Sequence, residues 1–249
     1  MKKIICFDNW TKGANHFERL TPIMNKAGYK LMLIHVGSWG HDMNRPKEEY
    51  IKKLQVRDIS YYKKMSFFEI LKNEKPELII FLSTRSLPNM SFNRCANYLG
   101  ISTCHLYHAL VNAQPLKNGE IDYSIKKSND FIRLLFRFYP VIRYIIPEYL
   151  LTLLKTKAPL KIWFEFLYFV IGKFIKNRFL LNRIITDSKT SIGCVYSNAD
   201  IYHMKKNYGL PINKIFTVGI PDFIRFKFKK SDLGSMLAKK NKNKNIIYL

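Results

Sequence analysis

Ionisable side chains lie beside two apolar segments that the sequence predicts as buried strands. Asp8 ends the first segment, Lys2–Asp8, and His16 lies in the first turn of the helical segment that follows. His108 comes directly after a later segment, Ile101–Tyr107. A helix N-terminus lowers the pKa of a nearby histidine toward a neutral imidazole that accepts a proton. We therefore take His16, His108 and Asp8 as candidates for acid–base catalysis; the alternatives are an exposed histidine at position 16 and a loop-fixing carboxylate at position 8.

Residues suited to binding an anionic ligand lie in or near the same predicted loops. Gly13 lets the backbone approach a ligand at the start of a helix, where N–H groups attract anions; the alternative is an ordinary turn glycine. Arg85 and Arg94 carry guanidinium groups that bind phosphate, although an exposed or ion-paired arginine is the more usual case. The predicted ligand-binding residues are Gly13, Ser83, Arg85, Asn89, Arg94 and Ser197.

The cysteines and the histidines show no metal-binding spacing. The four cysteines form no C-x-x-C pair, and the six histidines form no H-x-x-x-H pair. His35 and His105 fall inside predicted strands, where a core position is expected. No G-x-S-x-G, G-x-G-x-x-G or G-x-x-x-x-G-K-[ST] string occurs. We therefore expect no metal and no bound cofactor.

Short apolar runs alternate with segments that have apolar residues at helical spacing along most of the chain. Lys2–Asp8 and Tyr29–Val36 are typical of buried strands, and Asn15–Ala27 between them has apolar residues at helical spacing. This β-α-β order is the unit of a parallel sheet. The sequence predicts an α/β protein with a Rossmann-like, doubly wound parallel sheet. Further strands are expected at Asp58–Ile59, Glu77–Leu82, Ile101–Tyr107, Cys194–Ser197 and Lys214–Val218, and further helices at Phe67–Asn73, Ser91–Leu99 and Asp200–Tyr208.

A basic, aromatic-rich helical segment is inserted at residues 125–183. Its two helical stretches, Phe131–Leu154 and Leu160–Phe179, are interrupted by prolines. Such helices suit the interface of an anionic bilayer, but they can also pack on the sheet while their arginines reach water. Aromatic rings beside cations also suit single-stranded nucleic acid, which we do not expect because no recognition motif is present. The membrane-binding candidates are Arg133, Arg137, Arg143, Trp163, Lys173, Lys176 and Arg178.

The composition indicates a folded protein with an anionic partner. Of the 249 residues, 47% are hydrophobic, which is enough apolar surface to exclude a disordered chain. The net charge of +24 indicates an anionic partner. Residues 125–185 and 225–245 hold 16 of these net charges. No signal peptide opens the chain, and the most apolar stretch, Ile162–Ile171, is shorter than the roughly 20 residues of a membrane span. We expect a cytoplasmic protein with reduced thiols, peripheral at the inner face of the cytoplasmic membrane.

One long segment resembles a known enzyme family. Val195–Asp222 (VYSNADIYHMKKNYGLPINKIFTVGIPD) is similar to the end of the N-terminal domain of GT-B glycosyltransferases, where a helix after a strand ending in Ser leads to "yG-(I/V)-p-x-x-K-I" and "V-G-x-P-x-(D/F)". Lys75–Ile80 and Ala96–Ile101 resemble the preceding "KPD-hhh" and "A-x-x-L-G-I-P" parts. Among these enzymes, the motifs most resemble those of bacterial capsule, surface-polysaccharide and polyol-phosphate transferases. Ala109 departs from the glycine that follows the corresponding histidine in several of these families.

The resemblance implies a sugar transfer from a nucleotide sugar to a lipid-linked or glycan acceptor. It implies a Rossmann-like acceptor-side domain at residues 1–124 and 184–224, a helical membrane-interface insert at 125–183, and a linker with the first strand of a missing C-terminal domain at 225–249. Because the family binds the nucleotide mainly in that second domain, we expect this fragment to be inactive alone. The alternatives are a nucleotide-sugar epimerase of similar fold, which would need carboxylates in the cleft, and a non-catalytic module for lipid or nucleic acid.

Overall fold

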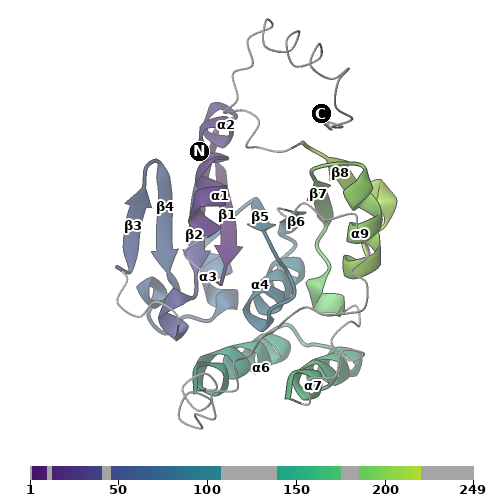
Figure 1. Ribbon diagram of the computed structural model, residues 1–249. Helices are drawn as coiled ribbons and strands as arrows, with labels where there is room; N and C mark the ends of the chain where they lie inside the picture. The colour runs from purple at the N-terminus through teal and green to yellow at the C-terminus, as the bar shows by residue number, and fades with distance from the viewer. Residues whose placement is uncertain (1, 10–12, 41–45, 108–138, 175–184, 220–249) are drawn as a thin grey trace, which may run out of the picture. The chain divides into compact units, whose positions relative to one another are not determined.

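The computed structural model describes residues 2–9, 13–40, 46–107, 139–174 and 185–219 (Figure 1). Residues 1–219 make up one compact unit, and residues 220–249 are a separate unit that lies outside the described residues. The predicted linker and strand at 225–249 therefore fall on residues that the structure does not describe. The same holds for residues 125–138 and 175–183 of the predicted insert.

An eight-stranded sheet forms the centre of the first unit, in the order β3-β4-β2-β1-β5-β6-β7-β8. Every neighbouring pair is parallel except β3 and β4, which are antiparallel. Without the edge strand β3, this is the doubly wound strand order 3-2-1-4-5-6 extended by one strand. The predicted Rossmann-like fold is confirmed. The strands are β1 (Lys2–Asp8), β2 (Tyr29–His35), β3 (Glu48–Ile51), β4 (Leu54–Asp58), β5 (Leu78–Phe81), β6 (Ser102–Leu106), β7 (Ile192–Val195) and β8 (Ile215–Thr217).

Apolar side chains alternate between the two faces of the sheet, and each face has its own core. Phe7 packs on one face with Phe67 and Phe92, and its ring stacks on that of Phe92 with centroids 4.1 Å apart. Cys6 points to the other face, where Phe17 is fully buried. Two cores on opposite faces are the consequence of a two-residue period in strands covered on both sides. The helices that contribute are α3 (Phe67–Glu74) and α4 (Leu87–Tyr98) on the first face and α1 (Ala14–Glu18) on the second.

The helix predicted over residues 15–27 is divided in two. The first part is α1, and the second is α2 (Thr21–Lys26), which has Pro22 in its first turn. Proline lacks an N–H donor and is favoured at the start of a helix. Of the short strand expected at Asp58–Ile59, Asp58 ends β4 and Ile59 begins the 3-10 helical segment η3 (Ile59–Tyr62). The hairpin partner of β4, β3, was not predicted. Glu48 of β3 is bound through its carboxylate to Gln55 and Arg57 of β4, so polar pairs hold this edge strand.

Two further helices pack on α4. They are α6 (Ile146–Lys155), preceded by the π-helical segment η5 (Val141–Ile145), and α7 (Leu160–Phe174). Tyr149, Leu153 and Phe169 are buried with Met90 of α4 in a third apolar cluster. Figure 1 shows α6 and α7 side by side at the bottom of the view, below α4. A helical segment is therefore inserted between β6 and β7, as the sequence predicts.

Candidate functional site

The strand order places a topological switch between β1 and β5. The chain leaves β1 toward β2 on one side and later returns to β5 on the other. Doubly wound sheets bind ligands beyond the carboxyl ends of their strands at such a point. Asp8 ends β1, and the loop Leu82–Ser86 connects β5 to α4. The predicted residues Asp8, Ser83 and Arg85 thus lie at this edge of the sheet.

Asp8 is engaged with the backbone that begins α1. Its carboxylate accepts a hydrogen bond of 2.7 Å from the N–H of Asn9. A Cβ atom at Gly13 would lie only 2.0 Å from Asp8 Oδ2, so glycine permits the close approach of the two segments. Gly13 therefore faces the carboxylate of Asp8, and His16 lies half-buried in α1. This contact supports the loop-fixing interpretation of Asp8.

A buried pair of ionisable groups lies next to Asp8 in the sheet. His35 is the register partner of Asp8 on β1 and of Asp58 on β4. Its Nδ1 lies 3.2 Å from Asp58 Oδ1, and both side chains are buried. Burial opposes ionisation of Asp58, but hydrogen bonds from His35, Ser38 and Ser60 outweigh it and hold its pKa well below the usual range. The sequence placed His35 in the core, and its partner is 23 residues away, so no local pattern indicated the pair.

The β5–α4 loop is held by its own side chains. Ser86 caps α4 and accepts a hydrogen bond of 3.3 Å from the N–H of Asn89. The Asn89 amide donates to the Ser83 carbonyl, and its Oδ1 is buried with no partner among the described residues. Asn89 therefore positions the loop rather than facing water. The loop presents Arg85 beside the N-terminus of a twelve-residue helix, where N–H groups favour anions.

Arg85 lies over an aromatic ring from the other side of the site. Its guanidinium carbon is 5.6 Å from the ring centroid of Tyr208, which belongs to α9 (Ala199–Tyr208). The Tyr208 ring in turn contacts His105 with centroids 4.2 Å apart. No carboxylate among the described residues pairs with Arg85. A half-buried cation without a counter-ion is suited to an anionic ligand.

His203 of α9 adds a neutral imidazole to this group. Burial lowers its pKa, Asp200 opposes that change, and the charges of Arg85 and Lys206 lower it further. The centroid of its ring lies 5.7 Å from that of Tyr107, the residue that follows β6. The sequence did not indicate His203, because its neighbour Arg85 is 118 residues away. We refer to Ser83, Arg85, Asn89, His203 and Tyr208 as the carboxyl-edge site.

Two other predicted ligand-binding residues are occupied by structural contacts. The Ser197 hydroxyl donates to Asp200 at 2.8 Å, and its N–H donates to the same carboxylate, which lies in the first turn of α9. Arg94 points away from the carboxyl-edge site and pairs with Asp187 Oδ1 at 2.9 Å. His108 lies outside the described residues, next to Tyr107. The structure thus brings Ser83, Arg85 and Asn89 together and leaves Arg94 apart.

The membrane-binding candidates are only partly described. Arg143 in η5 is exposed, and its guanidinium carbon lies 5.4 Å from the centroid of the Tyr139 ring. Trp163 of α7 packs against the apolar cluster that α6 and α7 form with α4. The side chain of Lys173 and residues Arg133, Arg137, Lys176 and Arg178 lie outside the part of the chain that is described. In the described part, no helix has the length and apolarity of a membrane span.

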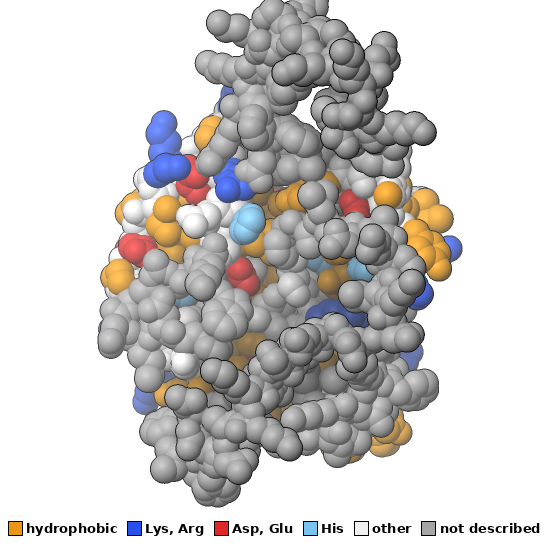
Figure 2. Space-filling model, in the orientation of Figure 1, with side chains coloured by type: hydrophobic (Ala, Val, Ile, Leu, Met, Phe, Trp, Pro, Cys, Tyr) orange, Lys and Arg blue, Asp and Glu red, His pale blue; other side chains and the backbone are white. Residues whose placement is uncertain are grey.

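The outer face of α6 and α7 is apolar and exposed. Leu154, Leu160 and Phe164 have 64%, 76% and 57% of their surface exposed. Figure 2 shows hydrophobic side chains of this kind reaching the surface at its lower right, where α7 lies. An amphipathic helix normally buries its apolar stripe, whereas these two helices bury one side against α4 and leave apolar residues on the other.

No three His, Cys, Asp or Glu side chains within the described ranges are grouped so that they could hold a metal ion. His35 and His105 instead contact a carboxylate and a backbone carbonyl, and the Nε2 atom of His203 lies 2.5 Å from the amide nitrogen of Asn207.

Comparison with known proteins gives no family. No protein-family model matches the chain, and no curated protein matches it. One similar solved structure, of S. aureus MnaA with UDP, has a TM-score of 0.29 and 11% identity over 91% of this chain and 70% of that chain. The class is defined instead by the strand order and its switch point: this is a Rossmann-like α/β protein with a cationic site at the carboxyl edge of its sheet.

Proposed function

We propose that this chain is the acceptor-side domain of a glycosyltransferase. In this proposal a sugar moves from a nucleotide sugar to a lipid-linked or glycan acceptor in bacterial surface-polysaccharide synthesis. The resemblance of Val195–Asp222 to the GT-B family supports it, as does the Rossmann-like sheet. The observation that carries it is Arg85, a cation without a counter-ion in the described structure, beside the N-terminus of α4.

Residues of the carboxyl-edge site could serve the acceptor side of such a transfer. A phosphate on the acceptor would bind to Arg85 and to the N–H groups of α4. The acceptor hydroxyl needs a base, and His203 has a lowered pKa that favours the neutral imidazole. His16, His108 and Asp8 are the alternative bases from the sequence. No metal or cofactor is proposed.

Binding of the acceptor tests the part of the function that this chain would carry. The affinity of the purified protein for a water-soluble, short-chain polyprenyl diphosphate is measured by titration. Arg85→Gln should weaken this binding by about tenfold or more, since the guanidinium would hold the acceptor phosphate. Arg143→Gln is the matched control, because Arg143 also lies over tyrosine rings but outside the site. Equal losses in the two variants, or no binding by the parent protein, would contradict the proposal.

We further propose attachment to the anionic inner surface of the cytoplasmic membrane through α6 and α7. Their exposed leucine and phenylalanine side chains support this, together with Arg143 and the basic residues of the insert. Apolar side chains enter the boundary of the headgroups while Lys and Arg pair with anionic lipid.

A further inference from the structure

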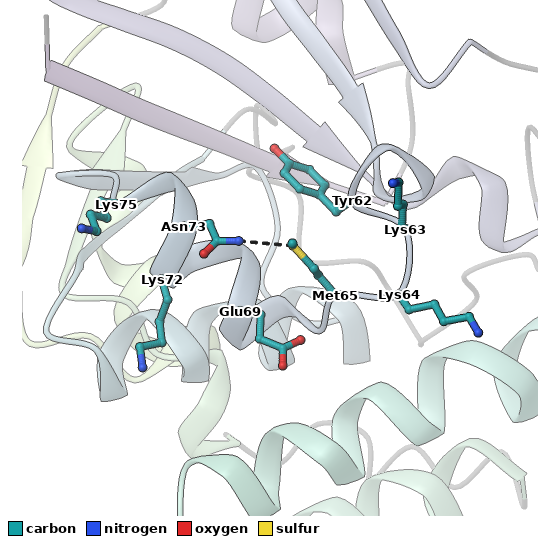
Figure 3. Close-up of a pocket in the computed structure, with 8 residues that line it drawn as sticks. All are labelled: Tyr62, Lys63, Lys64, Met65, Glu69, Lys72, Asn73 and Lys75. Carbon is teal, nitrogen blue, oxygen red and sulfur yellow. Dashed lines mark hydrogen bonds between the residues drawn. The ribbon is translucent and has the colours of Figure 1, made fainter.

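A groove lined by lysines runs along α3, away from the carboxyl-edge site. It has a volume of about 730 Å³. Figure 3 shows Lys72 and Lys75 at one end, Lys63 and Lys64 at the other, and Glu69 between them. The segment between the two ends includes η3 (Ile59–Tyr62) and the loop that leads into α3. All four lysines are exposed.

The acidic residues around this groove are already paired with other cations. Glu69 accepts hydrogen bonds from Lys155 of α6 and from Ser66, which lower its pKa to about 2, so it stays ionised and bound. Glu74 is paired with Lys3 and with Arg57. Among the described residues, the four lysines of the groove have no carboxylate partner. The groove is therefore strongly cationic.

The shape and the spacing favour an extended ligand. The eight residues of α3 rise about 12 Å along the helix axis, so the lysines at the two ends can reach several acidic groups of one chain. A concave groove suits a thread-like molecule, whereas a bilayer is met by a flat or convex apolar face such as that of α6 and α7.

The aromatic side chains of the groove are not available to stack on bases. Tyr62 is 6% exposed and donates its hydroxyl hydrogen to Glu74. The neighbouring Tyr61 is not among the residues that line the groove, and the guanidinium of Arg57 lies 4.2 Å from its ring centroid. Proteins that bind single-stranded nucleic acid without sequence preference use exposed rings as stacking platforms. The described lining of this groove offers lysines but no exposed ring.

We propose that the groove on α3 binds an extended chain of phosphate groups that carries no bases. Asn73, whose amide donates to Met65 Sδ at 3.3 Å, lies on the wall between the lysines and can donate a second hydrogen bond to a phosphate oxygen.

Inorganic polyphosphate of defined length is the probe for this proposal. Affinity is measured by fluorescence anisotropy between 50 and 200 mM salt, conditions chosen because phosphate contacts are salt-dependent. The double variant Lys64→Gln/Lys72→Gln should bind about tenfold more weakly and should reduce the slope of log affinity against log salt by about two, one per lysine. These two lysines have ordinary backbone angles, unlike Lys63 and Lys75 with their positive φ. Thermal melting of both variants checks that the fold is kept.

The matched control is Lys26→Gln/Lys53→Gln, which removes the same charge from exposed positions outside the groove. It should change the affinity less than twofold. An equal loss in the control would overturn the proposal in favour of general attraction to the net charge. Tighter binding of oligothymidylate than of polyphosphate, or binding to phosphatidylglycerol vesicles that depends on Lys64 and Lys72, would also overturn it. Polyphosphate binding without any binding of the short-chain polyprenyl diphosphate at Arg85 would contradict the proposed function and leave the groove intact.

Discussion

At the scale of single residues, Arg94 and Asp187 bury opposite charges where three helical elements meet. Arg94 of α4 donates to Asp187 in η6 (Thr186–Ser188) and to the hydroxyl of Thr156 at the end of α6. Tyr149 donates to the second carboxylate oxygen at 2.6 Å. The side chains of Arg94 and Asp187 are only 12% and 4% exposed, so each charge depends on its partner.

Removal of the Arg94 guanidinium should destabilise the fold strongly. Arg94→Ala leaves a buried carboxylate without its cation, which typically costs about 3–5 kcal/mol. Urea unfolding of the variant measures the change in the free energy of unfolding. Arg143→Ala, at an exposed position, should change it by less than about 1 kcal/mol. Similar values for the two variants would show that Arg94 is not a buried ion-pair partner.

Glu148 gives a prediction about pH. Burial raises its pKa to about 7, although the N–H of Phe67 donates to it at 2.8 Å. Because the folded-state pKa lies above that of the unfolded chain, the folded protein keeps a proton that the unfolded chain has lost. Stability should therefore fall as pH rises from about 4.5 to about 7. Glu148→Gln should remove this loss. Urea unfolding at pH 5 and pH 8 measures how much the free energy of unfolding falls between the two pH values, and this fall should be about 1–3 kcal/mol smaller in the variant than in the parent protein.

Glu77→Gln, at an exposed position, controls for the other groups that titrate in the same range. It should follow the parent protein at both pH values. A Glu148→Gln variant that loses as much stability as the parent would contradict the pKa given to Glu148.

Loop position predicted Arg85 and Asn89, but it could not separate Arg94 from them. All three lie within one helix and the loop before it, so their local patterns are alike. What distinguishes Arg94 is Asp187, a partner 93 residues along the chain. His203 was missed for the same reason, since burial and the distant Arg85 lower its pKa together with charges of its own helix.

At the scale of elements, the strands and helices of the sheet follow directly from apolar patterns. Ser66 and Glu69 form a capping box at the start of α3, and Gly209 in a left-handed conformation ends α9. The edge strand β3 was not predicted, because two of its four residues are glutamates and the strand is held by pairs across the hairpin. The helices α6 and α7 were predicted. Which of their faces is buried could not be predicted, because it depends on their packing against α4.

The exposed face of α6 and α7 leads to a prediction about membranes. The protein should float with vesicles that contain phosphatidylglycerol in a sucrose gradient and should not float with neutral vesicles. Leu154→Ser/Phe164→Ser should reduce flotation severalfold, because apolar area that enters the interface is lost. Tyr202→Ser/Ile212→Ser is the control, since these exposed apolar residues lie outside α6 and α7. Flotation that is unchanged in the first variant would contradict docking through these helices.

At the scale of the whole molecule, the sheet brings distant charges to one edge. Strand order places the loop after β5 beside α9, and Arg85 thereby reaches Tyr208 and His203. The remaining cations gather on other surfaces, four of them in the groove on α3. The net charge of +24 is thus spread over surfaces with different neighbours, which composition alone does not separate.

The most direct test of the central claim is the pKa of His203, followed by NMR of the histidine C–H signals. Arg85 contributes to lowering this pKa, so the parent protein should titrate below the ordinary value for histidine. A short-chain polyprenyl diphosphate bound at Arg85 should raise the pKa of His203, because it places negative charge beside the ring. Arg85→Gln should raise the pKa without ligand and should abolish the response to diphosphate. A His203 pKa that does not change with diphosphate, or that changes equally in the Arg85→Gln variant, would contradict a phosphate site at the carboxyl edge of the sheet.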